Sequence, residues 1–222
     1  MKTSSTIIIF DVEGTLVDCV AQTLESWQET LEESGHVVTR GSLQAYSGMD
    51  GREMLDRLLP GVPGDKKKEI LKRQGTLYEQ QHLRAVRSFP HVHELFRTLK
   101  KRGFTLAIGT TCKHDELAVY DKHMRVLEFT EAIACGDEVK RGKPNPDLFR
   151  CVLDKLGADE ARPAIAVGDT PYDAEAATAL RLQAVGVLTG GFSEEALRSA
   201  GCDRVLREVQ DFAYRTCREK TA

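Results

Sequence analysis

The chain has 222 residues, of which 41% are hydrophobic and 29% charged, and its formal net charge is −3. This length suits one substantial domain or a domain with a sizeable insertion. The weakly negative charge gives no reason to expect nucleic acid or an anionic membrane as partner. The six cysteines lack C-x-x-C spacing, and the first apolar run is too short for a signal peptide or a membrane span. We therefore expect reduced thiols in a cytoplasmic protein.

Five short apolar segments recur along the chain, each bounded by turn residues. They cover residues 6–11, 104–109, 131–135, 164–169 and 182–187. Because these segments are apolar throughout instead of alternating, they are typical of central strands that are covered on both faces. Helix-like segments lie between most of them. The alternation predicts an α/β fold with a doubly wound, mainly parallel sheet of the Rossmann-like type.

One interval breaks this alternation. Residues 19–86 contain no convincing strand but several helical patterns, the first with Val20, Leu24, Trp27 and Leu31 at spacings of four, three and four. A structureless loop of this length is improbable in a compact domain. We therefore predict an all-helical cap over 19–86, inserted into an α/β core formed by 1–18 and 87–222.

Polar side chains follow four of the predicted strands, at the sheet edge where ligands bind in parallel α/β folds. They are Asp11, Thr110, Thr111, Lys143, Asp169 and Asp173. Converging carboxylates would repel each other unless a hard cation lay among them, and oxygen ligands suit Mg²⁺. A lysine and a threonine hydroxyl supply the positive charge and hydrogen bond that a transferring phosphoryl group needs. The set predicts a phosphoryl-transfer centre with a carboxylate nucleophile.

The order of the motifs points to a known family. The segments FDVEGTLVD, LAIGTT, GKP and AVGDTPYDAEAA, with a helical insertion after the first, resemble the haloacid dehalogenase superfamily. The branch is that of phosphoglycolate phosphatase and β-phosphoglucomutase, which has a helical cap. The resemblance implies that Asp11 attacks phosphorus to give an aspartyl-phosphate and that Glu13 is the general acid and base.

The same resemblance implies the remaining roles. Mg²⁺ would be held by Asp11, by the main-chain carbonyl of Glu13 and by Asp169, while Asp173 would support either the waters of the metal or Lys143. Lys143 and Thr110 would bind the transferring phosphoryl group, with Thr111 beside them as a further substrate contact. The implied activity is the Mg²⁺-dependent hydrolysis of a small phosphorylated metabolite, such as phosphoglycolate or a sugar phosphate, by a monomer or homodimer.

Glu13 departs from the family pattern, since most phosphatases of the family have Asp there and enolase-phosphatases have Glu. The resemblance implies that the metal contact at this position is a backbone carbonyl, so the longer side chain concerns proton transfer to the leaving oxygen. One alternative is therefore a weakly active or binding-only relative. Another is a β-phosphoglucomutase-like phosphomutase, which would share the whole site.

Three further hypotheses concern single features. Arg52, in the segment SGMDGREML, is either a cap contact to substrate or an exposed arginine at the start of a helix. Cys135 and Arg141 have the spacing of cysteine-dependent phosphatases, but Asp137 and Glu138 fall where the phosphate would lie. A signalling receiver domain also forms an aspartyl-phosphate, yet the insertion after residue 18 speaks against it.

Overall fold

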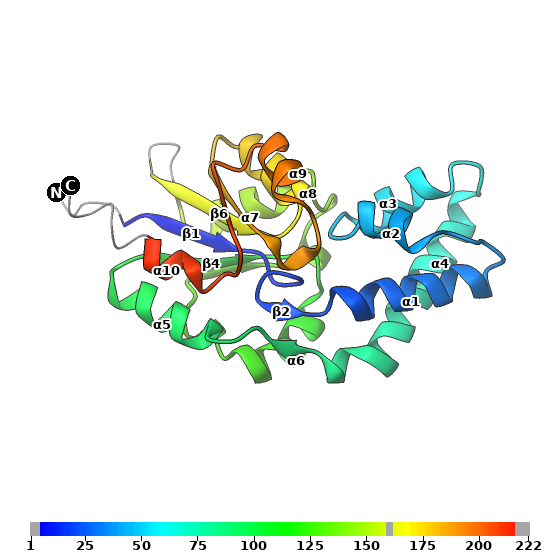
Figure 1. Ribbon diagram of the computed structural model, residues 1–222, viewed down its shortest axis with the longest axis horizontal. Coiled ribbons are helices and arrows are strands. Elements are labelled where there is room, and N and C mark those ends of the chain that lie inside the picture. The colour runs from blue at the N-terminus through cyan, green and yellow to red at the C-terminus, as the bar shows by residue number, and fades with distance from the viewer. Residues whose placement is uncertain (1–4, 159–161, 216–222) are drawn as a thin grey trace.

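The computed structural model describes residues 5–158 and 162–215. Its main sheet has the strand order β5-β4-β1-β6-β7-β8, and every pair of neighbours is parallel (Figure 1). The strands are β1 (Ile7–Phe10), β4 (Thr105–Gly109), β5 (Ala132–Ala134), β6 (Ala164–Gly168), β7 (Gln183–Val187) and β8 (Arg204–Leu206). The predicted α/β class with a doubly wound parallel sheet is confirmed. Strand β8 at one edge was not among the predicted elements.

Strand β1 lies at the point where the strand order reverses, between β4 and β6. Its side chains alternate between two apolar clusters, with Ile8 and Phe10 in one and Ile7 and Ile9 in the other. Helices cover both faces of the sheet (Figure 1). On one side lie α5 (Val92–Lys101), α6 (His114–Met124) and α10 (Asp211–Arg215), and on the other lie α7 (Asp147–Lys155), α8 (Pro171–Thr178) and α9 (Glu194–Ser199). Because both faces are covered, the strands of the middle of the sheet are mostly apolar.

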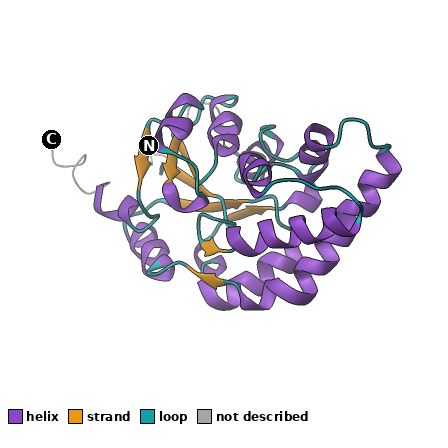
Figure 2. Cartoon of the chain, turned by 45° about the vertical axis from the view of Figure 1, so that its right-hand side comes forward, coloured by secondary structure: helices purple, strands orange, loops and turns teal. Residues whose placement is uncertain are grey.

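Residues 19–86 form a helical unit beyond the end of the sheet toward which β1 points (Figures 1 and 2). Its helices are α1 (Val20–Glu33), α2 (Arg40–Ala45), α3 (Gly51–Leu58) and α4 (Gly64–Leu77). The predicted stripe residues Leu24, Trp27 and Leu31 pack in an apolar cluster separate from the two beside the sheet. We keep the division into a core and a cap as a proposal that this separate cluster supports.

The two segments that connect the helical unit to the rest of the chain lie side by side. Strand β2 (Val17–Asp18) pairs with β3 (Arg87–Ser88) in a short antiparallel ribbon. Both crossing segments are therefore fixed side by side, next to the turn that follows β1.

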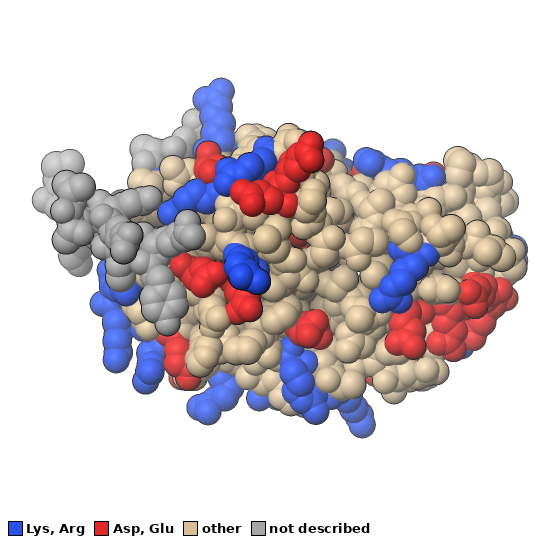
Figure 3. Space-filling model, viewed as in Figure 1, with Lys and Arg blue, Asp and Glu red and all other residues tan. Residues whose placement is uncertain are grey.

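The surface in Figure 3 carries scattered Lys and Arg side chains, while acidic side chains gather over α1. Glu25, Glu29 and Glu32 line a shallow groove there together with Arg40. This face therefore offers a polyanion no continuous basic surface. Among the described residues, no helix is both long and apolar enough to cross a lipid bilayer. The five described cysteines are free thiols, and Cys217 lies outside the described residues.

Candidate active site

Asp11 comes directly after β1, and its side chain is almost fully buried. Its backbone N–H donates to the carbonyl of Val167 over 2.9 Å, which fixes the end of β1 against β6. The chain then turns sharply, because the N–H groups of Leu16 and Val17 both donate to the carbonyl of Val12. Gly14 has a φ of 81° in this turn, a conformation that favours glycine. The turn places Asp11 and Glu13 at the carboxyl edge of the sheet.

Lys143 is buried between two carboxylates. Its Nζ contacts Asp11 Oδ1 and lies 2.6 Å from Asp173 Oδ1. Burial alone would lower the pKa of Lys143, but the charges of Asp11 and Asp173 raise it above its ordinary value. The lysine therefore stays protonated and can bind an anionic group brought to Asp11.

Asp173 has a second role in the fold. Its Oδ2 accepts hydrogen bonds from the N–H of Thr170 (3.1 Å) and from the hydroxyl of Thr170 (2.6 Å), so it takes part in the capping box at the start of α8. With Oδ1 facing Lys143, both oxygens are engaged. This geometry favours support of Lys143 among the roles that the resemblance implies for Asp173, and a metal role stays a prediction.

Asp169 follows β6 and is closely surrounded by backbone. Its Oδ1 accepts a hydrogen bond of 2.8 Å from the hydroxyl of Thr15. A Cβ atom would lie 2.3 Å from Asp169 Oδ2 if added to Gly14, and 2.0 Å if added to Gly190. Only glycine fits at these two positions while the carboxylate keeps its place. Burial raises the pKa of Asp169 well above its ordinary value, and the nearby charges of Asp11 and Asp173 add to this rise.

Glu13 reaches across the site to an aromatic pair. Its Oε1 accepts a hydrogen bond of 2.9 Å from the hydroxyl of Tyr120 on α6, and the hydroxyl of Tyr78 lies 2.7 Å from that of Tyr120. Burial raises the pKa of Glu13 to about 8, and the charges of Glu116 and Asp11 contribute. A carboxyl group that keeps its proton near neutral pH is suited to act as a general acid.

The two predicted threonines have different surroundings. Thr110 is fully buried, and its hydroxyl accepts from the N–H of Cys112 (3.3 Å) and donates to Cys112 Sγ (3.4 Å). Its backbone N–H donates to the carbonyl of Ala134 on β5. Thr111 instead lines the cavity above the site. In this structure Thr110 orders the loop after β4, and Thr111 faces the space that a substrate would enter.

Asp50 joins the helical unit to the loop that carries Lys143. It caps α3, its backbone N–H donates to the carbonyl of Lys143 (2.9 Å), and its Oδ2 accepts from the N–H of Gly142 (3.1 Å). Arg52 lines the cavity, but its Nε and Nη2 donate to Asp50 over 3.0 and 2.7 Å. The side chain of Arg52 is 55% exposed. Both hypotheses about Arg52, a substrate contact and an exposed arginine that opens a helix, are compatible with this position.

A cavity of about 470 Å³ lies between the helical unit and the sheet edge. Glu13, Asp169 and Thr111 line it from the core, and side chains of α1 to α4 line it from the helical unit. This volume lies in the range of about 300–1,000 Å³ that is typical of small-molecule sites. The predicted catalytic edge therefore adjoins a cavity of the size of a small-molecule site.

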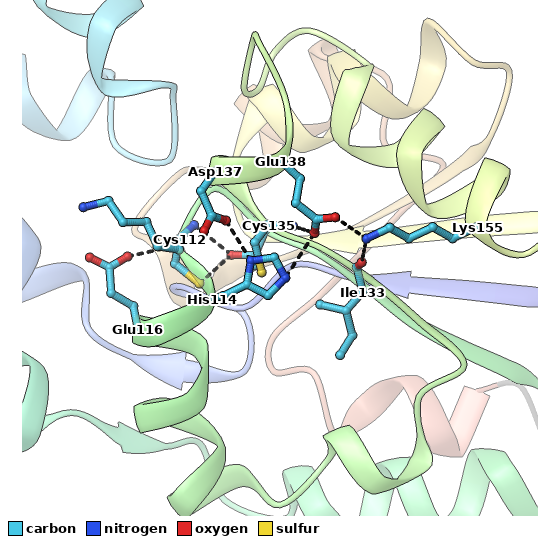
Figure 4. Close-up of polar contacts among 10 residues, drawn as sticks. Cys112, His114, Glu116, Ile133, Cys135, Asp137, Glu138 and Lys155 are labelled. Carbon is cyan, nitrogen blue, oxygen red and sulfur yellow. Dashed lines mark hydrogen bonds and ion pairs between the residues drawn. The ribbon is translucent and has the colours of Figure 1, made fainter.

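The rim formed by the loops after β4 and β5 contains the cysteine of the competing hypothesis (Figure 4). His114 Nδ1 lies 2.9 Å from Asp137 Oδ1, and His114 Nε2 lies 3.2 Å from Glu138 Oε1. Burial raises the pKa of Cys135 to about 12, and the charges of Asp137 and Glu138 contribute. Arg141 pairs with Asp147. Since a nucleophilic cysteine must be a thiolate, this geometry speaks against a cysteine-dependent phosphatase.

The donor set fits a hard divalent cation. Carboxylate oxygens of Asp11, Asp169 and Asp173 lie within 4.8 Å of one another, and all three residues are buried. Burial raises the pKa of Asp11 to about 6; the charge of Lys143 opposes this rise, and the charge of Asp173 adds to it. A second cation would relieve the repulsion that remains. Oxygen donors in a small, rigid site suit Mg²⁺ better than a metal that prefers nitrogen or sulfur ligands.

Comparisons with known proteins agree with this fold, which is that of a Rossmann-like α/β protein. A hydrolase from Pseudomonas syringae superposes with a TM-score of 0.88 at 28% identity, covering 96% of this chain and 98% of the other. Phosphoglycolate phosphatase from Agrobacterium fabrum is 30% identical over 96% of this chain and 91% of its own length. Pyrophosphatase PpaX from Bacillus pumilus is 28% identical over 92% and 93%, respectively.

The family assignment follows from the motif region. Residues 8–187 match the family described as haloacid dehalogenase-like hydrolase. The chain therefore belongs to the haloacid dehalogenase-like hydrolases, and the resemblance carried by its four motifs is confirmed.

Several contacts of the site were not predicted. Glu13 accepts a hydrogen bond from Tyr120, and Asp169 accepts one from Thr15. Asp50 is hydrogen-bonded to the loop that carries Lys143. The α6 helix that carries Tyr120 was itself missed, although its buried residues Leu117, Tyr120 and Met124 have a helical spacing of three and four. The hydrogen bonds themselves leave no signal in the sequence.

We expect Mg²⁺ to stabilise the chain, because it would relieve repulsion among the buried carboxylates. A tenfold excess over the dissociation constant stabilises by about 1.4 kcal/mol, which corresponds to a rise in Tm of roughly 3–6 °C for a chain of this size. Thermal melts with and without MgCl₂ measure this shift. Asp169→Asn should abolish the shift, whereas Asp65→Asn, an exposed aspartate of α4, should retain it. An equal shift in both variants would place the metal elsewhere.

Proposed function

We propose that this chain is a Mg²⁺-dependent phosphatase that hydrolyses a small phosphate monoester through an aspartyl-phosphate on Asp11. The observation that carries the proposal is the convergence of Asp11, Lys143 and Asp169 beside the cavity, with Glu13, whose pKa is raised to about 8, in the lining. A nucleophile, a phosphoryl-binding cation and a general acid are thus within one site.

In the first step, a carboxylate oxygen of Asp11 attacks phosphorus. The bond between phosphorus and the leaving oxygen breaks, and its electron pair stays on that oxygen, which takes the proton from Glu13. Lys143 offsets the charge of the phosphoryl oxygens, and Thr110 is the proposed hydrogen-bond donor beside it. Tyr120 holds Glu13 through its hydroxyl. The products are the free alcohol and the aspartyl-phosphate.

In the second step, Glu13, now a carboxylate, takes a proton from a water molecule whose oxygen attacks phosphorus. The bond between phosphorus and Asp11 breaks, which restores the carboxylate and releases inorganic phosphate. Asp11, Asp169 and the main-chain carbonyl of Glu13 would hold Mg²⁺, which would supply positive charge for the transfer of the phosphoryl group. The helical unit excludes bulk water in the first step.

The family includes relatives that support this class of substrate. The proteins similar to this chain are named a phosphoglycolate phosphatase and a pyrophosphatase, and another relative is named a phosphorylated carbohydrates phosphatase. All of these names describe small phosphorylated compounds. Phosphoglycolate and sugar phosphates are therefore the first compounds to test, and β-glucose 1-phosphate tests the phosphomutase that would share the site.

Asp11→Asn should lower kcat for release of inorganic phosphate by a factor on the order of 10³ or more, because an amide is a poor nucleophile. The measurement is a panel of phosphorylated metabolites assayed for free phosphate with Mg²⁺. Asp18→Asn, an exposed aspartate of β2, is the matched control and should keep the wild-type rate. Unchanged rates in Asp11→Asn would contradict the proposal, and conversion of β-glucose 1-phosphate without phosphate release would indicate the mutase.

Glu13→Gln should separate the two steps. With p-nitrophenyl phosphate, whose leaving group needs no proton, we expect a rapid burst of about one p-nitrophenol per enzyme. Turnover should then be slower than in the wild type by about 10²–10⁴-fold, the usual contribution of a general base. Stopped-flow absorbance measures both phases, and Glu128→Gln, an exposed glutamate, is the control. Steady turnover at the wild-type rate would show that Glu13 is not the base.

A further inference from the structure

The cavity is larger than its phosphoryl site requires. Its volume is about 470 Å³, whereas one water molecule accounts for about 30 Å³ of liquid. A phosphoryl group with a two-carbon body would leave most of this space to water. The cavity thus has room for a leaving group larger than two carbons, and its lining indicates the chemistry of that group.

The helical unit contributes polar and apolar side chains to the cavity, and five of the apolar ones come from its helices. These five form an apolar wall that consists of Leu24, Trp27, Leu43, Met54 and Leu71, which come from all four helices and belong to the apolar cluster of the unit. Gly51 keeps the start of α3 close to it, since a Cβ there would lie 2.7 Å from Leu71 Cδ1 and 3.3 Å from Trp27 Cζ2. A charged leaving group would lose its hydration against such a wall, whereas an apolar one would gain from the contact.

The charges around the cavity also disfavour an anionic leaving group. Its acidic lining residues are Glu13, Asp50, Glu116, Asp137 and Asp169. Of the residues that the structure describes, two cationic side chains line it, and one of them, Arg52, is bonded to Asp50. The other is Lys113, whose Nζ lies 3.7 Å from the position that a Cβ on Gly75 would occupy. Sites for a second phosphate or a carboxylate usually present a cluster of unpaired arginines or lysines.

We propose that the leaving group is an uncharged alcohol or phenol whose apolar body packs on the apolar wall. This inference rests on the proposed phosphatase activity. The phosphoryl group lies at the floor, near Glu13 and Asp169, and the body extends toward Trp27 and Leu71. Pyrophosphate and phosphoglycolate, which carry a second anionic group, fit this cavity poorly.

The test compares two esters of primary alcohols, 3-phenylpropyl phosphate and 3-carboxypropyl phosphate, whose leaving oxygens are chemically alike. With Mg²⁺ we expect kcat/KM to be at least about tenfold higher for the phenyl compound. Leu71→Arg should reduce this ratio by at least about tenfold, because it replaces part of the apolar wall by a cation. Val37→Arg adds the same charge at a side chain that is 93% exposed and should leave the ratio as it is.

The outcomes separate this inference from the function on which it rests. Equal or faster hydrolysis of the carboxylate compound by the wild type would overturn the inference and leave the phosphatase proposal in place. The inference would also be overturned if Leu71→Arg and Val37→Arg changed the ratio of the two kcat/KM values equally, since the apolar wall would then not select the substrate. Absence of phosphate release from both esters, and also from acetyl phosphate and pyrophosphate, would overturn the phosphatase proposal itself.

Discussion

The site depends on the burial of three carboxylates around one lysine. Removing charged groups from water costs several kcal/mol for each, and a single cation cannot compensate three anions. Burial raises the pKa values of Asp11 and Asp169, and the neighbouring carboxylates add to the rise although Lys143 opposes it. Such a cluster persists because the surrounding fold fixes it, through the packing of Gly14 and Gly190 against Asp169 and the capping box that holds Asp173. The proposed divalent cation would offset the negative charge that Lys143 leaves uncompensated.

Hydrogen bonds also link the carboxyl edge of the sheet to the helical unit. Asp50 at the start of α3 is bonded to the backbone on both sides of the peptide that joins Gly142 to Lys143. Tyr78, at the end of α4, completes the hydrogen-bonded chain to Glu13. Movement of the unit would therefore disturb Lys143 and Glu13 together. This arrangement suits a reaction that must exclude water in one step and use it in the next.

Much of the architecture was predictable because burial leaves a pattern in the sequence. The predicted sheet is confirmed, since five of its strands are mostly apolar and therefore stand out in the sequence. Strand β8 was missed because it is a three-residue edge strand in which Arg204 and Val205 are only partly buried. The polar residues at the strand ends could be found because the carboxyl edge of a parallel sheet brings them together whatever the details of packing.

What the sequence could not supply are contacts between segments far apart in the chain. The role of Glu13 is the clearest case. In the sequence, the longer side chain of Glu13 is only a departure from a family pattern. The structure shows that this side chain accepts a hydrogen bond from Tyr120, which lies 107 positions away along the chain. Likewise, the apolar stripe of α1 predicts that Leu24 and Trp27 are buried, but the sequence does not reveal that they also form the wall of a cavity.

The most direct test of the central claim is to identify the residue that carries the phosphoryl group. The enzyme would be mixed with p-nitrophenyl phosphate and Mg²⁺, quenched in acid and reduced with borohydride, which converts an aspartyl-phosphate to homoserine. Peptide mass spectrometry would then locate the modified residue, with Glu13→Gln used to let the intermediate accumulate. We predict homoserine at position 11. A phosphoryl group on another residue, such as Cys135, or turnover without any covalent intermediate in this variant would contradict the account.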